Sequence, residues 1–185
     1  MTPRILVLEG DHATGTTTHT DLLTGALQRD GRRAVAFHHA RPKHTDPVSA
    51  ALDYAIQRRE FLRTCDAEVV VADRWRSSTW AKAYQFIFLG DGYRDREIGY
   101  ALRGLFQAEG EYARESALVL LTAGDAVLDD RLAARGIGAV AREALAERRA
   151  FAESMKSAEV PSIDTSRPAD VVATELLAWA RGVLR

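Results

Sequence analysis

The stretch ILVLEGDHATGTTT, residues 5–18, decides how this chain folds. Its first four residues are apolar and predict a buried strand, and its end opens a helical pattern that runs to Leu27. Between the two lies a loop bounded by Gly10 and Gly15. In this arrangement backbone N–H groups and a helix N-terminus can surround a phosphate. We therefore predict a phosphate-binding loop; the alternative is a strand-to-helix turn whose threonines only cap the helix.

The loop differs from a standard P-loop at one position. A P-loop has a lysine after its second glycine, which reaches the β- and γ-phosphates, and then a Ser/Thr hydroxyl that holds Mg²⁺. Here Thr16 stands at the lysine position and Thr17 at the hydroxyl position. The cradle itself does not need the lysine, because backbone N–H groups form it. The predicted ATP-phosphate contacts are Gly10, Asp11, His12, Ala13, Thr14, Gly15, Thr16, Thr17 and Thr18.

Composition places the chain among ordinary globular proteins. Its 185 residues are 46% hydrophobic and 28% charged, which predicts one domain over residues 1–185. The formal net charge of −1 gives no general attraction to nucleic acid or to an anionic membrane. The sequence shows no apolar run of about 20 residues and no signal-peptide pattern. The single cysteine, Cys65, suits a reducing compartment, so we expect a cytoplasmic protein without a membrane partner.

Short apolar runs alternate with longer 3.6-residue patterns along the rest of the chain. This alternation predicts βαβ units and an α/β fold of three layers with a five-stranded parallel sheet. Strands are expected at 4–9, 34–38, 68–72, 117–122 and 160–163. Helices are expected at about 16–29, 47–63 with Asp46 as N-cap, 77–88, 96–114, 125–135, 141–156 and 168–184. Ligands bind beyond the carboxyl ends of such strands, where Asp73-Arg74-Trp75 follows the third one.

These features resemble the thymidylate kinase family of nucleoside monophosphate kinases over nearly the whole chain. The family's loop reads Glu-Gly, a variable residue, Asp-Gly, a small residue, then Gly-Lys-Ser/Thr-Thr. The positions that match it are Glu9, Gly10, Gly15, Thr17 and Thr18. His12 falls at the family's loop aspartate, and Thr16 falls at its lysine. The resemblance implies the P-loop NTPase fold with a short helical lid, here at about residues 135–150.

The resemblance assigns roles to the residues that follow the third strand. The family has an Asp-Arg-aromatic triplet there and then a helix start that contains serine, as in Ser77-Ser78-Thr79. It implies that Asp73 lies near Mg²⁺ together with Thr17, partly through water, and that Arg74 binds the acceptor's phosphate. Thr79 is assigned to the same substrate side. These roles fit the chemistry of carboxylate and guanidinium groups; the alternative is a surface ion pair between Asp73 and Arg74.

A tyrosine and an arginine on the second predicted helix match the family's base-binding pair. Tyr54 and Arg58 are four residues apart and so share one face of the helix. By resemblance, the aromatic ring stacks on a pyrimidine base and the arginine donates hydrogen bonds to it. As an isolated pair, the two side chains would more simply pack on each other. Arg41 falls where the family often has a glutamate that contacts the substrate's sugar-phosphate side. The charge at this position is therefore positive instead of negative.

Further cations are expected around the donor phosphates. The segment 128–136 resembles the transition into the family's lid, which supplies arginines that close over those phosphates. We assign Arg131 to phosphate binding and Arg135 and Arg142 to catalysis. Lys82, and Lys43 in the adjacent loop, are candidates to replace the missing lysine. An exposed arginine-rich helix face is the alternative for the residues beyond 140.

Taken with the resemblance, the sequence predicts a kinase that transfers the γ-phosphate of ATP, with Mg²⁺, to a pyrimidine nucleoside monophosphate. A dTMP-like acceptor is the first expectation, and the family implies a homodimer. Thr16 leaves two alternatives open. One is a nucleotide-binding homologue with weak or no catalysis, and the other is a kinase for a modified base or a specialised nucleoside.

Overall fold

A computed structural model describes residues 2–10, 13–89, 93–110, 112–113, 115–136 and 160–185. Within these ranges the chain is α/β and holds a five-stranded parallel sheet, which confirms the predicted fold class. The strands are β1 (Arg4–Gly10), β2 (Ala34–His38), β3 (Val69–Asp73), β4 (Ala117–Thr122) and β5 (Ser162–Asp164). The helices are α1 (Thr16–Arg29), α2 (Pro47–Thr64), α3 (Arg76–Tyr84), α4 (Tyr93–Glu109), α5 (Asp125–Ala134) and α7 (Ala169–Val183). A π-helical turn (Gln85–Leu89) continues α3.

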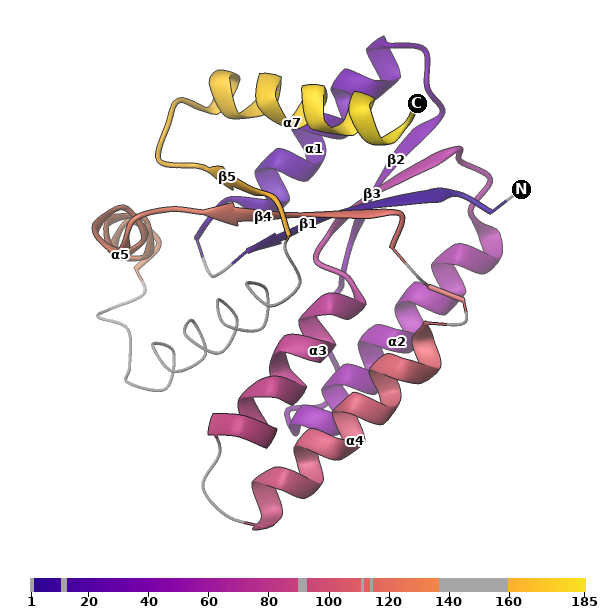
Figure 1. The fold of residues 1–185 in the computed structure, drawn as a ribbon, viewed down its shortest axis with the longest axis vertical. Helices are drawn as coiled ribbons and strands as arrows, with labels where there is room; N and C mark the ends of the chain where they lie inside the picture. The colour runs from indigo at the N-terminus through magenta and orange to yellow at the C-terminus, as the bar shows by residue number, and fades with distance from the viewer. Residues whose placement is uncertain (1, 11–12, 90–92, 111, 114, 137–159) are drawn as a thin grey trace.

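Two helical layers enclose the sheet. Figure 1 shows α1 and α7 above the sheet and α2, α3 and α4 below it. Alternate residues of β1 serve the two faces: Leu6 and Leu8 belong to the upper core, and Ile5 and Val7 belong to the lower core. All four side chains are almost completely buried, as expected for a central parallel strand. None of the helices in the described ranges is both long and apolar enough to cross a membrane.

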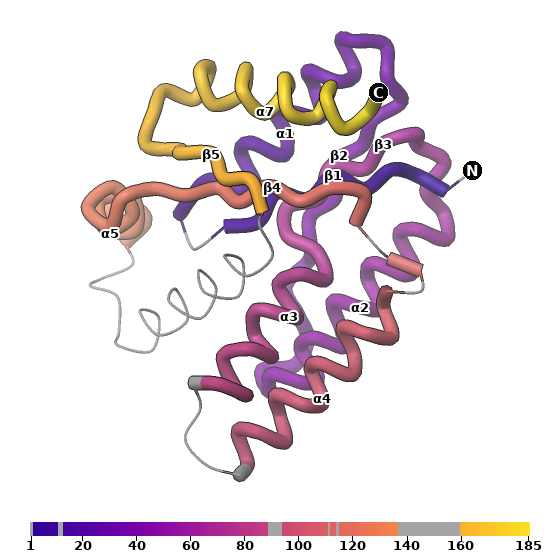
Figure 2. The backbone as a smooth tube through the Cα atoms, in the orientation of Figure 1, coloured from indigo at the N-terminus to yellow at the C-terminus, as the bar shows by residue number. Residues whose placement is uncertain are grey.

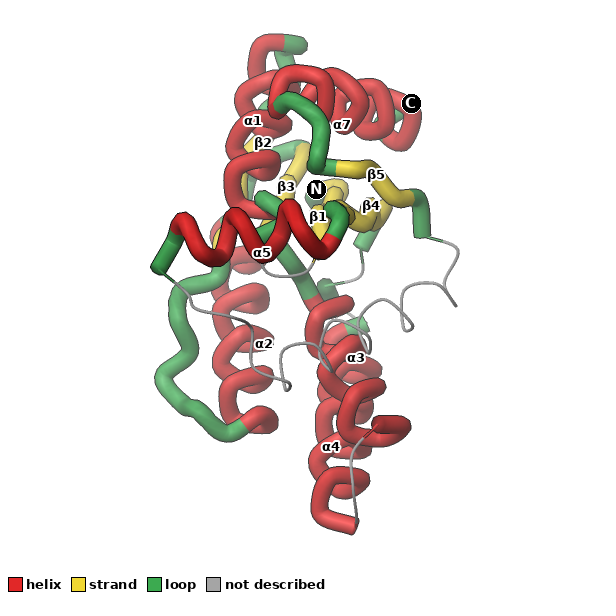
Figure 3. The backbone as a smooth tube through the Cα atoms, turned by 90° about the vertical axis from the view of Figure 1, so that its left-hand side faces the viewer, coloured by secondary structure: helices red, strands yellow, loops and turns green. Residues whose placement is uncertain are grey.

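The strand order brings the carboxyl ends of β1, β2 and β3 together. The order across the sheet is β2-β3-β1-β4-β5, with β1 in the centre. Figure 3 looks onto this edge, with α5 lying across it, and Figure 2 shows the chain running along β4 and into α5. Asp73 pairs in register with Leu8 on one side and with His38 on the other. The register therefore sets Asp73 between the loop that follows β1 and the end of β2.

Helix α2 begins where the sequence predicts, whereas helix α4 ends earlier than predicted. Asp46 accepts a hydrogen bond from the Ser49 N–H at 2.9 Å, so α2 begins at Pro47 as predicted. The predicted helix 96–114 was wrong at its end, because α4 stops at Glu109. The backbone N–H of Gly110 donates to the Gln107 carbonyl at 3.1 Å, which closes a tight turn instead of continuing the helix.

Candidate functional site

The loop after β1 has the backbone geometry that its glycines suggest. Gly15 is the N-cap of α1 with φ 86°, and Ala13 is also in the left-handed region with φ 67°. Among the described side chains, none donates to or accepts from the α1 terminus as a cap. The first-turn N–H groups of a helix lack intrahelical partners, so this terminus is suited to bind an anion. Asp11 and His12 lie outside the described residues.

Gly10 cannot carry a side chain in this loop. A Cβ there would lie 2.3 Å from the Thr14 hydroxyl oxygen and 2.8 Å from the Leu121 carbonyl oxygen. The hydroxyl can rotate away, but the carbonyl belongs to the backbone of β4. Gly10→Ala should therefore lower the free energy of unfolding by about 1–3 kcal/mol, as overpacking commonly does. Gly124→Ala is the matched control, because its Cβ would meet nothing within 4 Å. Urea unfolding of both variants tests this, and equal stabilities would contradict it.

The structure brings Thr17 and Asp73 into direct contact. The Thr17 hydroxyl donates a hydrogen bond to Asp73 Oδ2. The Asp73 side chain is 14% exposed, so it faces solvent without lying free in it. One hydroxyl and one carboxylate oxygen fit Mg²⁺, which prefers oxygen ligands and keeps several waters when bound to protein. Thr17 and Asp73 would hold the ion at this point.

His38 belongs to the same cluster, although the sequence analysis assigned it no role. Its Nδ1 lies 3.4 Å from Asp73 Oδ2, and its Nε2 lies 3.0 Å from Asp21 Oδ1 on α1. The signal was present in the sequence, since His38 ends β2 as Asp73 ends β3. Within the described part of the chain, no group of three or more His, Cys, Asp or Glu side chains is arranged to hold a metal ion by itself.

Arg74 stands beside the loop in a strained conformation. Its φ of 63° is in the left-handed region, which costs a non-glycine residue about 1 kcal/mol or more. The strained residue is anchored by its N–H, which donates to the Leu8 carbonyl at 3.0 Å. Its guanidinium donates to the Gly10 carbonyl at 3.4 Å. The predicted phosphate ligand is thus half-buried at the start of the loop.

Glu9 supports this turn from inside the protein. Its carboxylate is fully buried and accepts hydrogen bonds from the Trp75 N–H at 3.0 Å and from the Ser77 and Ser78 hydroxyls at 2.8 Å. Burial raises the pKa of Glu9, and the Arg74 charge with these hydrogen bonds acts in the opposite direction. Glu9 therefore connects the end of β1 to the start of α3, a role that the sequence pattern did not reveal.

Arg131 reaches the other end of the loop from α5. Its Nη1 donates to the Ala13 carbonyl at 3.2 Å, and its Nη2 donates to the Thr165 carbonyl at 2.6 Å. Burial lowers the pKa of His19, and the positive charge of Arg131 lowers it further. The guanidinium thus joins the loop to the turn after β5.

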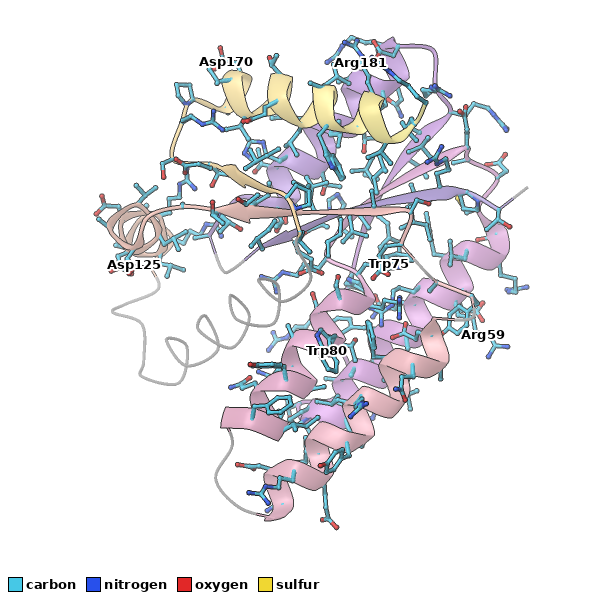
Figure 4. All side chains as sticks on the ribbon, in the orientation of Figure 1. Arg59, Trp75, Trp80, Asp125, Asp170 and Arg181 are labelled. Atoms are coloured by element: carbon cyan, nitrogen blue, oxygen red, sulfur yellow. The ribbon has the colours of Figure 1, made fainter. Side chains whose placement is uncertain are left out.

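Arg58 points inward and is 1% exposed. Its Nε and Nη2 donate to the two oxygens of the fully buried Glu109 at 2.6 and 2.7 Å. Its Nη1 lies 2.9 Å from Nε2 of His39. Figure 4 shows the neighbouring Trp75 between the sheet and the helices below it. The structure therefore uses Arg58 inside the protein, and not at a surface where a base could lie.

His39 is held in an apolar, aromatic environment next to this pair. Its ring meets those of Phe37 and Tyr54 edge-on, with centroids 4.8 Å away in both cases. Burial, and then the Arg58 charge, lower the pKa of His39 to about 3. The ring is consequently neutral near pH 7.

Because the pKa of His39 is lowered, the stability of the folded protein should depend on pH. Between about pH 6.5 and 3 the histidine is protonated in the unfolded chain and neutral in the folded one, so acid favours unfolding. This group costs no stability above about pH 6.5, and below it the free energy of unfolding should fall by about 1.4 kcal/mol per pH unit. His39→Phe should flatten this slope relative to the wild type. Urea unfolding from pH 4 to 8 measures it, and parallel profiles for the two proteins would contradict it.

The remaining predicted residues lie at different depths around the site. Tyr54 is half-buried and Arg41 is exposed, on a loop that α2 holds through Gln57 and Asp53. Thr79 is 5% exposed on α3. Lys82 lies farther along α3, with its ammonium 6.0 Å from the Phe86 ring centroid. Arg135 is exposed just after α5, and Arg142 lies outside the described residues.

The site as a whole joins a glycine-bounded loop, a helix terminus, a hydroxyl–carboxylate pair and two arginines at one edge of a parallel sheet. Such an arrangement can bind an anion and a hard cation side by side. No family model matches the sequence, and no curated protein matches it either.

Proposed function

We propose that this chain is a nucleotide kinase that transfers the γ-phosphate of ATP to a pyrimidine nucleoside monophosphate, with a dTMP-like acceptor first. The observation that carries the proposal is the contact between Thr17 and Asp73 at the α1 terminus. It sets a hydroxyl and a carboxylate where a P-loop kinase needs its Mg²⁺ ligands. When bound there, Mg²⁺ would neutralise charge on the donor phosphates. The resemblance of the sequence to thymidylate kinases supplies the acceptor class.

In this proposal the chain's own residues position the phosphates. The α1 terminus and loop backbone bind the donor, and Arg74 binds the acceptor's phosphate close to it. Phosphoryl transfer depends on such positioning and on charge stabilisation more than on covalent chemistry from the protein. Arg135 and Arg142 are proposed to close over the donor as part of a lid.

Two guanidinium groups supply positive charge that the loop's Thr16 lacks. Arg74 contacts the Gly10 carbonyl and Arg131 contacts the Ala13 carbonyl, so one arginine lies at each end of the loop. These contacts support the arginines over Lys82 as the replacement for the lysine. Their charge is fixed by hydrogen bonds, whereas a loop lysine is mobile.

On the acceptor side, Tyr54 is proposed to contact the base, whereas Arg58 lies inside the protein. Tyr54 remains half-buried at the surface, but the N–H groups of Arg58 already contact Glu109 and His39.

Leu52 and Ile56, on the same helix α2, are 49% and 52% exposed and are four residues apart. This exposed apolar pair supports a homodimer formed through α2.

A coupled assay of ADP formation tests the proposed function. The purified protein is given ATP and Mg²⁺ with each common nucleoside monophosphate and nucleoside in turn. We expect ADP to form fastest with a pyrimidine monophosphate and much more slowly without an acceptor. A protein that binds ATP and dTMP by calorimetry but forms no ADP with any acceptor would overturn the proposal.

The missing lysine supports a second candidate, a nucleotide-binding protein without turnover. Thr16 is 7% exposed at the first position of α1 and carries no charge toward the phosphates. Thr16→Lys in the same assay separates the two candidates. A large gain in ADP formation over an inactive wild type would favour the second, because it restores a lost function. An active wild type with little gain would favour the kinase.

A further inference from the structure

Consecutive residues at the end of β1 hold the turn that carries Arg74. The Leu8 carbonyl accepts a hydrogen bond from the Arg74 N–H at 3.0 Å, and the Gly10 carbonyl accepts one from its guanidinium at 3.4 Å. Between these two residues, Glu9 Oε1 accepts a hydrogen bond from the Trp75 N–H at 3.0 Å. The strand therefore binds the turn through two backbone carbonyls and one side chain.

The Glu9 carboxylate also reaches the first turn of α3. Its Oε1 accepts from the Ser77 hydroxyl at 2.8 Å, and the Ser78 hydroxyl lies 2.8 Å from Oε1 and 3.0 Å from Oε2. Glu9 is 0% exposed, so water does not compete for these hydrogen bonds. A single buried carboxylate thus joins β1 to the turn and to the helix that follows it.

The residue after Arg74 is fixed by its side chain as well as by its backbone. The Trp75 indole N–H donates to the Ala113 carbonyl at 2.6 Å, and its ring meets that of Phe37 edge-on at 5.0 Å. Arg74 has a φ of 63°, and such strain persists only where surrounding contacts hold it. Glu9 binds the backbone N–H directly after this residue, so its carboxylate helps to hold Arg74 in its strained conformation.

We propose that Glu9 is a positioning residue for Arg74 and thereby sets the affinity of the site for the acceptor's phosphate. This rests on the proposed function, because it takes Arg74 as the ligand of that phosphate. A guanidinium binds phosphate through directional hydrogen bonds, which a displaced arginine loses. Within the described residues, the hydrogen bonds of the Glu9 carboxylate go to Trp75 and to the start of α3, and not to the α1 terminus. The effect should therefore fall on acceptor binding more than on donor binding.

Two substitutions of Glu9 separate the reach of its side chain from its charge. Glu9→Asp keeps the charge but is one methylene group shorter, so its carboxylate should no longer reach the Trp75 N–H. Glu9→Gln keeps the reach, because its amide oxygen can replace Oε1 and its nitrogen can donate to the Ser78 hydroxyl in place of Oε2. Glu115→Asp is the matched control, because it shortens a half-buried carboxylate that pairs with Arg76 of α3 at 2.8 Å.

The readout is calorimetric binding of the acceptor, and separately of ADP with Mg²⁺, on variants shown to be folded by thermal unfolding. The acceptor probe is dTMP, or whichever nucleoside monophosphate gives the fastest ADP formation. Glu9→Asp should weaken acceptor binding about tenfold or more, as the loss of a hydrogen bond to a charged group commonly does. Its ADP binding should stay within about threefold of wild type, as should both affinities in Glu9→Gln and Glu115→Asp. If Glu9→Asp does not fold, the double variant Ser77→Ala/Ser78→Ala, which removes both hydroxyls from the carboxylate, takes its place.

A double-mutant cycle checks that Glu9 acts through Arg74. Arg74→Met removes the guanidinium and so should itself weaken acceptor binding. Adding Glu9→Asp to Arg74→Met should then weaken acceptor binding by no more than about twofold, because the group that Glu9 positions is already absent.

The outcomes distinguish this inference from the proposed function. A wild-type protein that binds none of the nucleoside monophosphates overturns the proposed function and the inference with it. A wild-type protein that binds the acceptor, with an affinity that Glu9→Asp leaves unchanged, overturns the inference alone. Equal losses in Glu9→Asp and Glu9→Gln, or equal losses of acceptor and ADP binding, also overturn it, because they report a lost charge or general damage. A full further loss in the double variant with Arg74→Met has the same consequence.

Discussion

Replacing Asp73 with Asn should lower kcat/KM for ADP formation by at least about 10²-fold. Asn keeps the size of the side chain and can still accept a hydrogen bond from Thr17. It removes the negative charge that we propose binds Mg²⁺. Losing one preorganised electrostatic contact in an active site commonly costs about 10²–10³-fold in rate. The same change should raise the Mg²⁺ concentration that gives half-maximal activity. A coupled assay with a Mg²⁺ titration measures both effects.

Asp170→Asn is the matched control for this substitution. Asp170 is exposed in the first turn of α7, in the upper helical layer, on a different element from Thr17 and Asp73 (Figure 4). Its replacement should leave kcat/KM and the Mg²⁺ requirement unchanged. If the Asp73→Asn enzyme kept activity within about threefold of wild type, the assignment of Asp73 as a Mg²⁺ ligand would be wrong.

Glu109→Gln should have the largest effect on stability. The substitution keeps the volume but leaves the Arg58 charge buried without a counter-ion. Removing one partner of a buried ion pair commonly costs about 3–5 kcal/mol, because the remaining charge has lost its water and its partner. Urea unfolding measures the change. The double variant Arg58→Met/Glu109→Leu should be more stable than Glu109→Gln, since it removes both charges.

An exposed ion pair supplies the comparison for Glu109. Arg167 and Glu175 pair with side chains that are 41% and 46% exposed. Glu175→Gln should change the free energy of unfolding by about 1 kcal/mol or less, because water solvates the remaining arginine. Equal losses in the two single variants would show that burial of the Arg58–Glu109 pair does not govern its contribution.

Most of the fold was predictable because its signals are local. The run Val69–Ala72 in β3 is apolar and too short for a helix, and the Asp46-Pro47 pair marks the start of α2. The end of α4 was missed although Gly110, directly after Glu109, is the residue type that commonly follows the last turn of a helix. The order of the strands depends on pairings between distant segments, which local patterns do not specify.

The candidate site was predictable in part. Asp73 could be placed at the carboxyl edge of the sheet because it ends a buried strand, whereas its pairing with Thr17 came from the resemblance to thymidylate kinases. The ion pair between Arg58 and Glu109 could not be predicted, since Glu109 is distant in sequence and lies on another helix. One signal for the direction of Arg58 was available: Ala51, Ala55 and Arg58 follow the helical spacing of a buried face.

The central place of β1 also orders events during synthesis. By residue 73 a growing chain holds β1, β2 and β3, which are adjacent and form one half of the sheet. The other edge of β1 receives its partner only when residues 117–122 have been made, and α7 closes the upper core last, with Val172 and Leu176. Such non-local pairing slows folding and exposes apolar surface while it waits. The nascent chain therefore gains its protected upper core only after α7 has been made.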